Sequence, residues 1–312
     1  MHLSELVAVL VFLSAIVAVY VVAGALLFRA IRRRFARQAV PTSKSEVWTR
    51  RGFLGLAAGG IGCMAYGYSV EPDWLEVTHH RLPCAKLPRG SQPIRIVHIS
   101  DLHSEPTPHL EARLPGVIAV EKPDLIVFTG DAANSPDGVP TFRRCIERIA
   151  AIAPTYAVKG NWDVRHWVPA DLFAGTGVTK LEVGSVVVTV RGTRLWIGGA
   201  TDWPDLGHVL ATVPADMPTL LLYHFPDAAH LAAKHGIDLY CCGHTHGGQV
   251  ALPFYGALVT LSRFGKRYEA GLYRVQDTWL YVNRGIGTEG STPRVRFCAR
   301  PEVTVIDLVP PE

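Results

Sequence analysis

Five short apolar runs in this chain share one feature: each is followed directly by a polar side chain. The runs are rich in β-branched and aliphatic residues, which is typical of buried strands, and helical patterns separate the earlier ones. Such alternation predicts an α/β fold. Because open α/β sheets place their ligand sites beyond the carboxyl ends of the strands, the five polar ends are expected to meet. The runs are IRIVHIS (94–100), DLIVFTG (124–130), TYAVKG (155–160), TLLLY (219–223) and DLYCCG (238–243).

The polar residues at these ends form a nitrogen and oxygen ligand set. Taken singly, each is weak evidence, because a lone His is more often a hydrogen-bonded structural residue and Gly-Asp after a strand is often a turn. Together, carboxylates, imidazoles and a carboxamide suit Zn, Mn or Fe. Seven ligands are too many for one ion and suit two, about 3.5–4 Å apart, with Asp131 between them. The seven residues are Asp101, His103, Asp131, Asn161, His224, His244 and His246.

The rest of the body is predicted to contain two helices and two hairpins. Helical patterns lie near residues 110–121 and 141–151. Residues 179–199 and 268–283 alternate as antiparallel hairpins do, which indicates a second sheet. No linker interrupts residues 76–312, so we expect them to form one domain.

The first 75 residues have the character of membrane segments. Residues 6–28 are 23 consecutive residues without a charge, long enough to cross about 30 Å of hydrocarbon. Eight basic residues follow between positions 29 and 51, and the positive-inside rule places them in the cytoplasm and the amino terminus outside. We therefore assign residues 1–51 to an N-terminal transmembrane helix with a basic cytoplasmic flank.

A second, weaker apolar segment occupies residues 52–75. Its start, with Thr49, Arg50, Arg51, Phe53 and Leu54, resembles a twin-arginine export signal, which carries a folded domain across the membrane. No A-x-A cleavage site follows, so an uncleaved anchor is expected. This interpretation places the domain on the outer, periplasmic face of a bacterial-type inner membrane. The alternative is a segment that lies in the interface or packs on a cytoplasmic domain.

Charge and cysteine content argue against several classes of protein. Residues 1–51 hold eight of the 31 basic and two of the 27 acidic side chains, so the remainder carries 23 and 25 and is close to neutral. A nearly neutral body argues against nucleic-acid binding, which depends on contacts of basic side chains with phosphates. The six cysteines show no CxxC spacing, which argues against a zinc ribbon or a redox pair.

The polar motifs, in this order, resemble those of the calcineurin-like metallophosphoesterases. The longer stretch HTHGGQVALPFYG (244–256) resembles the membrane-anchored or twin-arginine-exported phosphodiesterase branch of that family. The resemblance covers residues 94–309 and implies a four-layer α/β/β/α sandwich with two mixed sheets, here preceded by the transmembrane helix. The motifs are DLH (101–103), GD (130–131), GNWD (160–163), HFPD (224–227) and GHTHGGQV (243–250).

The resemblance also implies which residues hold which ion. Asp101, His103 and His246 would bind one divalent ion and Asn161, His224 and His244 the other, with Asp131 shared. Two ions, Mn, Zn or Fe, would polarise a phosphoryl group and activate a water molecule. Asp131, Asn161 and His246 are the members of this set that we name as catalytic. Asn161 is a neutral ligand, which leaves more positive charge for the substrate.

Trp162 departs from the family pattern, which usually reads Gly-Asn-His with a His that acts on the leaving group. One explanation is lost activity, which an intact ligand set argues against. Another is that His166 replaces the missing His from four residues on, in what the sequence predicts to be a loop. We favour a third, in which the leaving group is already a stable anion, as in pyrophosphate cleavage, and Trp162 contacts a base, a sugar or an acyl chain. Trp162 as a simple cover over the metals remains a fourth.

Further polar residues are candidates for substrate contact or support. Arg296, or Arg284, is a candidate contact for a substrate phosphate, and either could equally be an ion-pair partner. Residues that could orient the ligands or arginines are Asp163, Asp202 and Glu302.

The predicted function is a membrane-anchored, metal-dependent phosphoesterase that hydrolyses a phosphodiester or pyrophosphate, with a lipid-linked or envelope substrate. One alternative is a UDP-2,3-diacylglucosamine hydrolase of lipid A biosynthesis, which faces the cytoplasm. The other is a binding module that keeps the fold without catalysis. The implied partners are the phosphate-ester substrate and the membrane.

Overall fold

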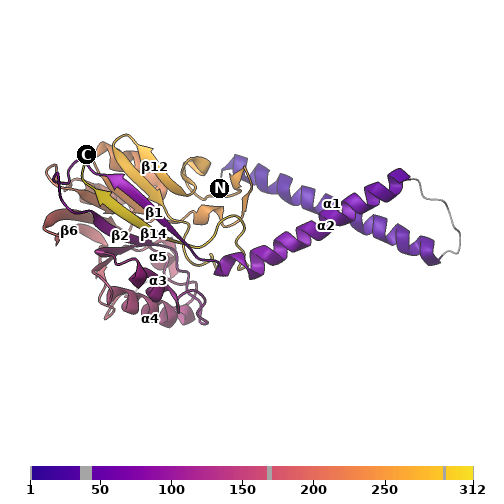
Figure 1. Cartoon of the computed structure of the whole chain (residues 1–312), viewed down its shortest axis with the longest axis horizontal. Coiled ribbons are helices and arrows are strands. Elements are labelled where there is room, and N and C mark those ends of the chain that lie inside the picture. The colour runs from indigo at the N-terminus through magenta and orange to yellow at the C-terminus, as the bar shows by residue number, and fades with distance from the viewer. Residues whose placement is uncertain (1, 36–43, 167–170, 291–292, 312) are drawn as a thin grey trace.

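The computed structural model describes residues 2–35, 44–166, 171–290 and 293–311. Two long helices, α1 (Leu3–Phe35) and α2 (Lys44–Ser69), cross one another and extend away from a folded domain (Figure 1). The amino terminus and the end of α2 both lie at the domain end of this pair. The boundary expected between residues 51 and 52 falls inside α2.

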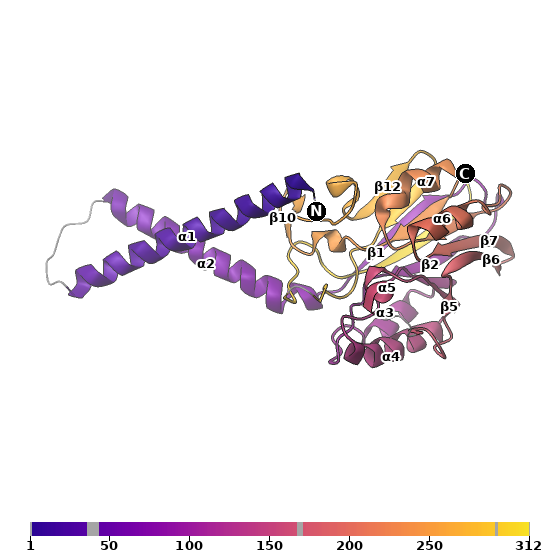
Figure 2. The ribbon, with the colours of Figure 1, turned by 180° about the vertical axis from the view of Figure 1, so that it is seen from behind.

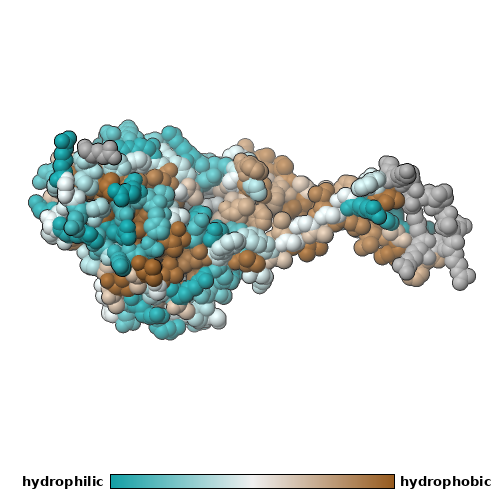
Figure 3. All heavy atoms as spheres, viewed as in Figure 1, coloured by the Kyte–Doolittle hydropathy of each residue, from teal (hydrophilic) through white to brown (hydrophobic). Residues whose placement is uncertain are grey.

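Both helices have the length and composition of membrane spans. Apolar windows within Leu3–Arg32 and Val47–Asp73 have mean hydropathies of 3.0 and 1.3, and only 6% and 11% of these windows are buried. Low burial distinguishes them from core helices of a soluble domain. They contact each other near Tyr20, whose hydroxyl donates to the carbonyl of Ala57 at 3.3 Å. Hydrophobic residues cover much of the helix pair, whereas the visible domain surface is mixed (Figure 3).

The first sheet has six strands in the order β1-β14-β2-β3-β4-β5. Strands β2 to β5 run parallel, β14 runs antiparallel to β2, and β1 runs parallel to β14, so the sheet is mixed. The sequence analysis does not predict β1 or β14. The bounds are β1 (Glu76–Pro83), β2 (Ile94–Ile99), β3 (Leu125–Phe128), β4 (Thr155–Ala157), β5 (Thr179–Lys180) and β14 (Glu302–Val309).

The second sheet is also mixed and has the order β12-β13-β9-β8-β7-β6. The two predicted hairpins are confirmed as the antiparallel pairs at its edges, β6 with β7 and β12 with β13. A small separate pair, β10 (Ala251–Leu252) and β11 (Gly256–Ala257), lies outside both sheets. The bounds are β6 (Val183–Val190), β7 (Thr193–Ala200), β8 (Thr219–Leu222), β9 (Leu239–Cys242), β12 (Gly271–Val275) and β13 (Thr278–Val282).

Three hydrophobic cores define four layers, as expected. Helices α3 (Leu114–Val120) and α4 (Val139–Ala150) pack on the outer face of the first sheet. The inner faces of the two sheets share a second core, and α6 (Trp203–Leu210) with α7 (Ala229–Lys234) covers the second sheet. The first helix is shorter than predicted because Pro115 stands in its first turn, where the missing N–H does no harm.

Candidate metal centre

Five strand ends deliver the seven predicted ligands to one place. Strands β2, β3 and β4 of the first sheet and β8 and β9 of the second all stop within a few residues of a ligand. The carboxylate and ring-nitrogen atoms form two groups, each with its atoms within 4.8 Å of one another. These groups are Asp101, His103 and His246, and Asp131, His224 and His244. They match the two predicted sets, to which Asn161 adds an amide oxygen.

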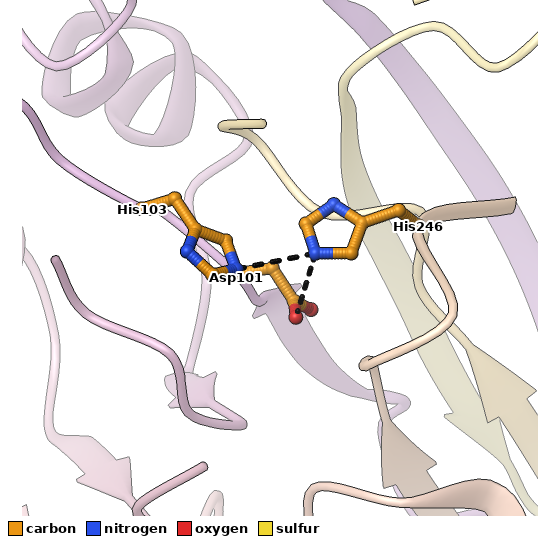
Figure 4. A group of neighbouring side chains, drawn as sticks. All are labelled: Asp101, His103 and His246. Atoms are coloured by element: carbon orange, nitrogen blue, oxygen red, sulfur yellow. Dashed lines mark hydrogen bonds and ion pairs between the residues drawn. The ribbon is translucent and has the colours of Figure 1, made fainter. Parts of the chain in front are cut away.

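The first group joins the two sheets. His246 Nε2 lies 3.2 Å from His103 Nε2 and 3.4 Å from Asp101 Oδ1 (Figure 4). All three side chains are buried, and the rings and the carboxylate point toward a common centre. Two imidazole nitrogens and a carboxylate oxygen therefore converge on one point.

The second group meets the first at Asp131. Asp131 Oδ2 lies 3.2 Å from His224 Nε2 in its own group and 3.5 Å from His103 Nε2 in the other. Asn161 Oδ1 lies 3.1 Å from His224 Nε2, so the amide faces the same centre. His244 Nε2 lies 3.4 Å from the carbonyl oxygen of Leu261, which leaves Nδ1 for the site.

Partners outside the centre set the direction of two imidazoles. His103 Nδ1 lies 2.7 Å from Asn134 Oδ1, and the Asn134 amide nitrogen donates to the carbonyl of Thr288. His224 Nδ1 lies 2.7 Å from the carbonyl of Thr129. An Nδ1–H donated outward leaves a lone pair on each Nε2. The sequence analysis misses Asn134, although its place three residues after Asp131 is a usable signal.

The backbone around the ligands is held in uncommon conformations. A non-Gly residue with positive φ is unusual and is typical of strained functional positions. Glycines also let the backbone pass close to the carboxylates: a Cβ on Gly160 would lie 2.2 Å from Asp131 Oδ1, and one on Gly243 2.0 Å from Asp101 Oδ2. The ligand residues with positive φ are Asp101 (49°), His103 (42°), Asp131 (59°), His244 (72°) and His246 (52°).

The charge and the donor atoms of the two groups can be compared with what a pair of metal ions requires. Buried carboxylates and inward lone pairs repel one another unless positive charge lies between them. Without a metal, a second proton on His224 supplies part of it: burial lowers the pKa of His224, but Asp131 and Asp101 outweigh burial and raise it to about 9, so a cation bound there would replace the proton on Nε2. The donors are the nitrogen and oxygen atoms that Zn, Mn and Fe prefer. The centre therefore fits two divalent cations.

Asp163 supports the loops that carry two of the ligands. Its carboxylate accepts the backbone N–H groups of Asp131 and Gly160 at 2.8 and 2.9 Å, and that of Ala132 at 2.8 Å. Burial and the neighbouring Asp131 raise the pKa of Asp163 to about 6. The prediction that Asp163 orients ligands thus agrees with its contacts, which reach them through the backbone.

Trp162 and His166 lie on a short helix, α5 (Asn161–His166), and not in the predicted loop. The Trp162 backbone N–H donates to Asp131 Oδ1 at 2.8 Å. Its ring packs edge-on against His103, with centroids 5.5 Å apart, and at 4.7 Å against His166. Trp162 therefore lies between a metal ligand and the one nearby imidazole that the sequence suggests as a replacement acid.

The arginines and the remaining carboxylates have structural contacts. Arg296 is fully buried, and its guanidinium donates to the carbonyls of Ala299, Arg284 and Gly287 and lies 3.4 Å from His246 Nδ1. Such a position supports His246 from behind.

Arg284 pairs with Glu302 at 3.1 Å and with Glu76 at 2.7 Å, so Glu302 orients an arginine as predicted. Asp202 instead caps α6, because its side chain accepts the backbone N–H of Asp205.

A cavity of about 910 Å³ opens over the centre. Asp131, Asn161, His244 and His246 line its floor. Trp162 and His166 line it too, together with Arg165, a cation that the sequence analysis misses. The wall has apolar side chains, Phe225, Val250, Val259, Leu261, Pro293 and Val295, and also polar ones, Thr245, Gln249, Thr260 and Glu289.

Comparison with known proteins gives the same assignment. The family model for calcineurin-like phosphoesterases matches residues 94–248. The chain is 33% identical over 281 residues to the uncharacterized metallophosphoesterase YkuE of Bacillus subtilis, with 83% of this chain and 97% of the relative covered. It is 31% identical over 275 residues to phosphodiesterase YaeI of Escherichia coli, with 84% and 99% covered.

A relative from Bos taurus, named transmembrane protein with metallophosphoesterase domain, is 31% identical over 261 residues, with 74% of this chain and 56% of the relative covered. Its name and the two apolar helices both point to membrane association. Together with the two mixed sheets, the Asp/His groups and the relatives matched over nearly their full length, this gives one conclusion. The chain belongs to the calcineurin-like metallophosphoesterase family, whose members are metal-dependent hydrolases of phosphate esters.

Proposed function

We propose that this chain is a membrane-anchored phosphodiesterase with two metal ions that cleaves a phosphodiester or pyrophosphate bond of a lipid-linked substrate at the outer face of the membrane. The observation that carries the proposal is the pair of Asp/His groups that meet at Asp131 beneath an open cavity. An intact ligand set of this kind argues against a binding module that has lost catalysis.

Asp131, Asn161 and His246 are the residues that we propose as catalytic. Bound divalent ions supply Lewis-acid polarisation of the phosphoryl oxygens. Asp131 faces both groups through Oδ2 and would therefore be shared by the two ions. Asn161 adds an oxygen without adding negative charge, which favours an anionic substrate. Arg165, on the cavity wall, is placed to contact a second phosphate or another anionic group.

The apolar cavity wall supports a lipid-linked substrate. Val250, Val259, Leu261 and Val295 line the cavity, and so does Trp162, whose ring packs against His103. A phosphate head group on the polar floor and an apolar chain along this wall would each meet matching chemistry. The anchor would keep such a substrate within reach because both are confined to the bilayer.

The helix pair supports an external domain. The amino terminus and the domain lie at one end of the pair, and Arg29 and Arg32 of α1 with Arg50 and Arg51 of α2 lie toward the other end. The positive-inside rule assigns the basic end to the cytoplasm, so the domain would lie outside. A UDP-2,3-diacylglucosamine hydrolase needs a cytoplasmic site and is therefore the second candidate.

Hydrolysis of bis(4-nitrophenyl) phosphate by the full chain in detergent, loaded with manganese or zinc, tests the catalytic proposal. We expect turnover that His224→Ala abolishes and that Val187→Ala, at an exposed site on β6, leaves unchanged. Two bound metals without turnover on this or a pyrophosphate substrate would contradict catalysis. Fewer than about one metal per chain would point to the binding module.

A reporter fused after Glu312 tests the side of the membrane. Activity of a reporter that works only outside the cytoplasm is expected. Activity of a cytoplasmic reporter instead would overturn the external placement and would favour the UDP-2,3-diacylglucosamine hydrolase.

A further inference from the structure

We propose that the β10–β11 hairpin is a third membrane contact, which inserts its aromatic tip into the lipid interface and holds the mouth of the cavity against the bilayer. We call residues 251–262 the interfacial loop. This inference rests on the membrane placement in the proposed function and not on the identity of the substrate.

The tip of the interfacial loop exposes large apolar side chains. Phe254 is fully exposed and has φ +65°, and Tyr255 and Leu261 are 49% and 55% exposed. Removing such side chains from water is favourable in proportion to the apolar area that is buried. A cluster of this kind on one loop is typical of a contact surface.

The tip is held in place, so its exposure is built into the fold. Lys266 lies over the Tyr255 ring at 3.6 Å from its centroid and donates to the carbonyls of Tyr255 and Ala257. Glu269 accepts the backbone N–H of Ala257 at 3.1 Å. These contacts fix the turn from the side that faces the domain.

The interfacial loop is bound to the domain end of α1. Glu5 accepts the backbone N–H and the hydroxyl of Thr260 at 2.9 and 2.7 Å, and His2 Nε2 lies 3.0 Å from the carbonyl of Ser262. Figure 2 shows β10 beside the start of α1. Since the uncharged run begins one residue after Glu5, the loop lies at the level where α1 enters the bilayer.

The domain end of α2 is linked to the same loop through Phe297. The Ala251 backbone N–H donates to the carbonyl of Phe297 at 2.8 Å, and the Phe297 ring packs edge-on against Tyr66 of α2. The interfacial loop is therefore linked by tertiary contacts to the domain ends of both helices. Hydrophobic surface in Figure 3 runs from the helices onto this end of the domain.

Charge near the loop fits a phospholipid surface. Arg263 and Arg267 are exposed and Lys266 is half-buried, and the acidic side chains beside them are Asp227, next to Arg263, and Glu269, next to Lys266. Aromatic side chains at the head-group level, with cations that contact lipid phosphates, are typical of interfacial segments. Val250, Val259, Thr260 and Leu261 from this part of the chain also line the cavity. Insertion of the tip would therefore bring the cavity mouth to the head groups.

Fluorescence quenching by lipids with a spin label on the acyl chain tests the insertion. The full chain, with Cys63→Ser and Cys298→Ser to remove the exposed thiols, is placed in phosphatidylcholine and phosphatidylglycerol vesicles. A fluorophore is attached to Phe254→Cys, to Leu13→Cys on an exposed face of α1, or to Val187→Cys on β6 at the far end of the domain. We expect strong quenching at Leu13, partial quenching at Phe254 and none at Val187.

Two results would overturn the inference, and only one of them also overturns the membrane placement of the chain. Quenching at Leu13 with none at Phe254 refutes the interfacial loop and leaves the membrane anchor intact. No quenching at Leu13 refutes the membrane placement itself. As a second readout, Phe254→Asp should reduce hydrolysis of a vesicle-borne phosphodiester lipid severalfold and leave soluble bis(4-nitrophenyl) phosphate unaffected, whereas Val187→Asp should change neither.

Discussion

At the scale of single residues, Trp162 stands where the family motif usually has a His. Its backbone N–H binds Asp131, and its ring lies between His103 and His166. Indole can neither give nor take a proton at neutral pH, so a leaving group that needs protonation receives no help from this position. The sequence identifies the substitution, but the packing partners of the ring become visible only in three dimensions.

We expect Trp162→His to act selectively on substrates with poor leaving groups. General acid catalysis contributes about 10²–10⁴-fold, and only where the leaving anion is unstable. The wild type should therefore hydrolyse aryl phosphodiesters much faster than alkyl phosphodiesters, and Trp162→His should narrow that ratio. Steady-state rates on the two substrates measure it, with Trp162→Phe as control. Equal wild-type rates on both would contradict the role given to the leaving group.

His98 is a buried histidine outside the metal centre. It is fully buried in β2, and its Nε2 lies 2.9 Å from the Thr129 hydroxyl. Burial lowers its pKa to about 3. In the unfolded chain, His98 has an ordinary histidine pKa near 6.5. Between this pH and the folded pKa, His98 is protonated in the unfolded chain but neutral in the folded protein. The free energy of unfolding therefore falls as pH drops below about 6.5, until the folded pKa is reached.

The size of this effect is testable with His98→Gln. Each pH unit between the two pKa values costs up to about 1.4 kcal/mol of folding stability. We expect the melting temperature of the wild type to fall more steeply than that of His98→Gln between about pH 6.5 and pH 5. Parallel melting curves in the two proteins would show that His98 does not titrate as burial requires.

At the scale of elements, strand ends were predictable and helix positions were less so. A buried run followed by Asp, Asn or His is a local signal, so the ligand ends of β2, β3, β4, β8 and β9 could be read from sequence. Helix α5 could not be, because it is only six residues long and has no apolar period. Strands β1 and β14 pair with each other although they stand at opposite ends of the domain sequence. No local pattern in either strand specifies the other as its partner.

The end of α2 is linked to a metal ligand through one short segment. The Arg296 backbone N–H donates to the carbonyl of Gly67 at 2.9 Å, while the Arg296 guanidinium lies beside His246. A Cβ on Gly67 would lie 3.1 Å from the Arg296 carbonyl oxygen, whereas one on Gly62 would meet no atom within 4 Å. The end of α2 therefore contacts Arg296, the residue that packs against His246.

We expect Gly67→Leu to weaken metal binding and Gly62→Leu to leave it unchanged. The added side chain must displace residues 295–297, and loss of an outer contact to a ligand costs about 10–100-fold in metal affinity. Competition with a chelator, read as metal retained per chain, measures the effect in both variants. Similar retention in the two would mean that α2 and the centre are independent.

At the scale of the whole molecule, the metal centre joins the two sheets. Asp101, His103, Asp131 and Asn161 follow strands of the first sheet, and His224, His244 and His246 follow strands of the second. Because the ligands come from strands that are far apart in the chain, the sequence could identify these residues but could not give the distances between them. Ions bound at these residues would therefore stabilise the contact between the sheets.

Chelation should therefore lower the stability of the domain. An ion at about 100 times its dissociation constant stabilises the folded state by about 2.7 kcal/mol. We expect the melting temperature to drop by several degrees with EDTA, and His224→Ala to show a smaller drop. A wild-type melting temperature that EDTA does not change would argue against metals that link the sheets.

The shared end of α1 and α2 also bears on how the enzyme acquires its metals during biogenesis. If the domain lies outside, every ligand from Asp101 to His246 must cross the bilayer after synthesis. The twin-arginine-like residues favour a domain that folds before it crosses. Such a domain would bind its metal ions in the cytosol and carry them across the membrane. A domain that crosses unfolded would take them from the envelope. The route of export would then set which metal the mature enzyme contains.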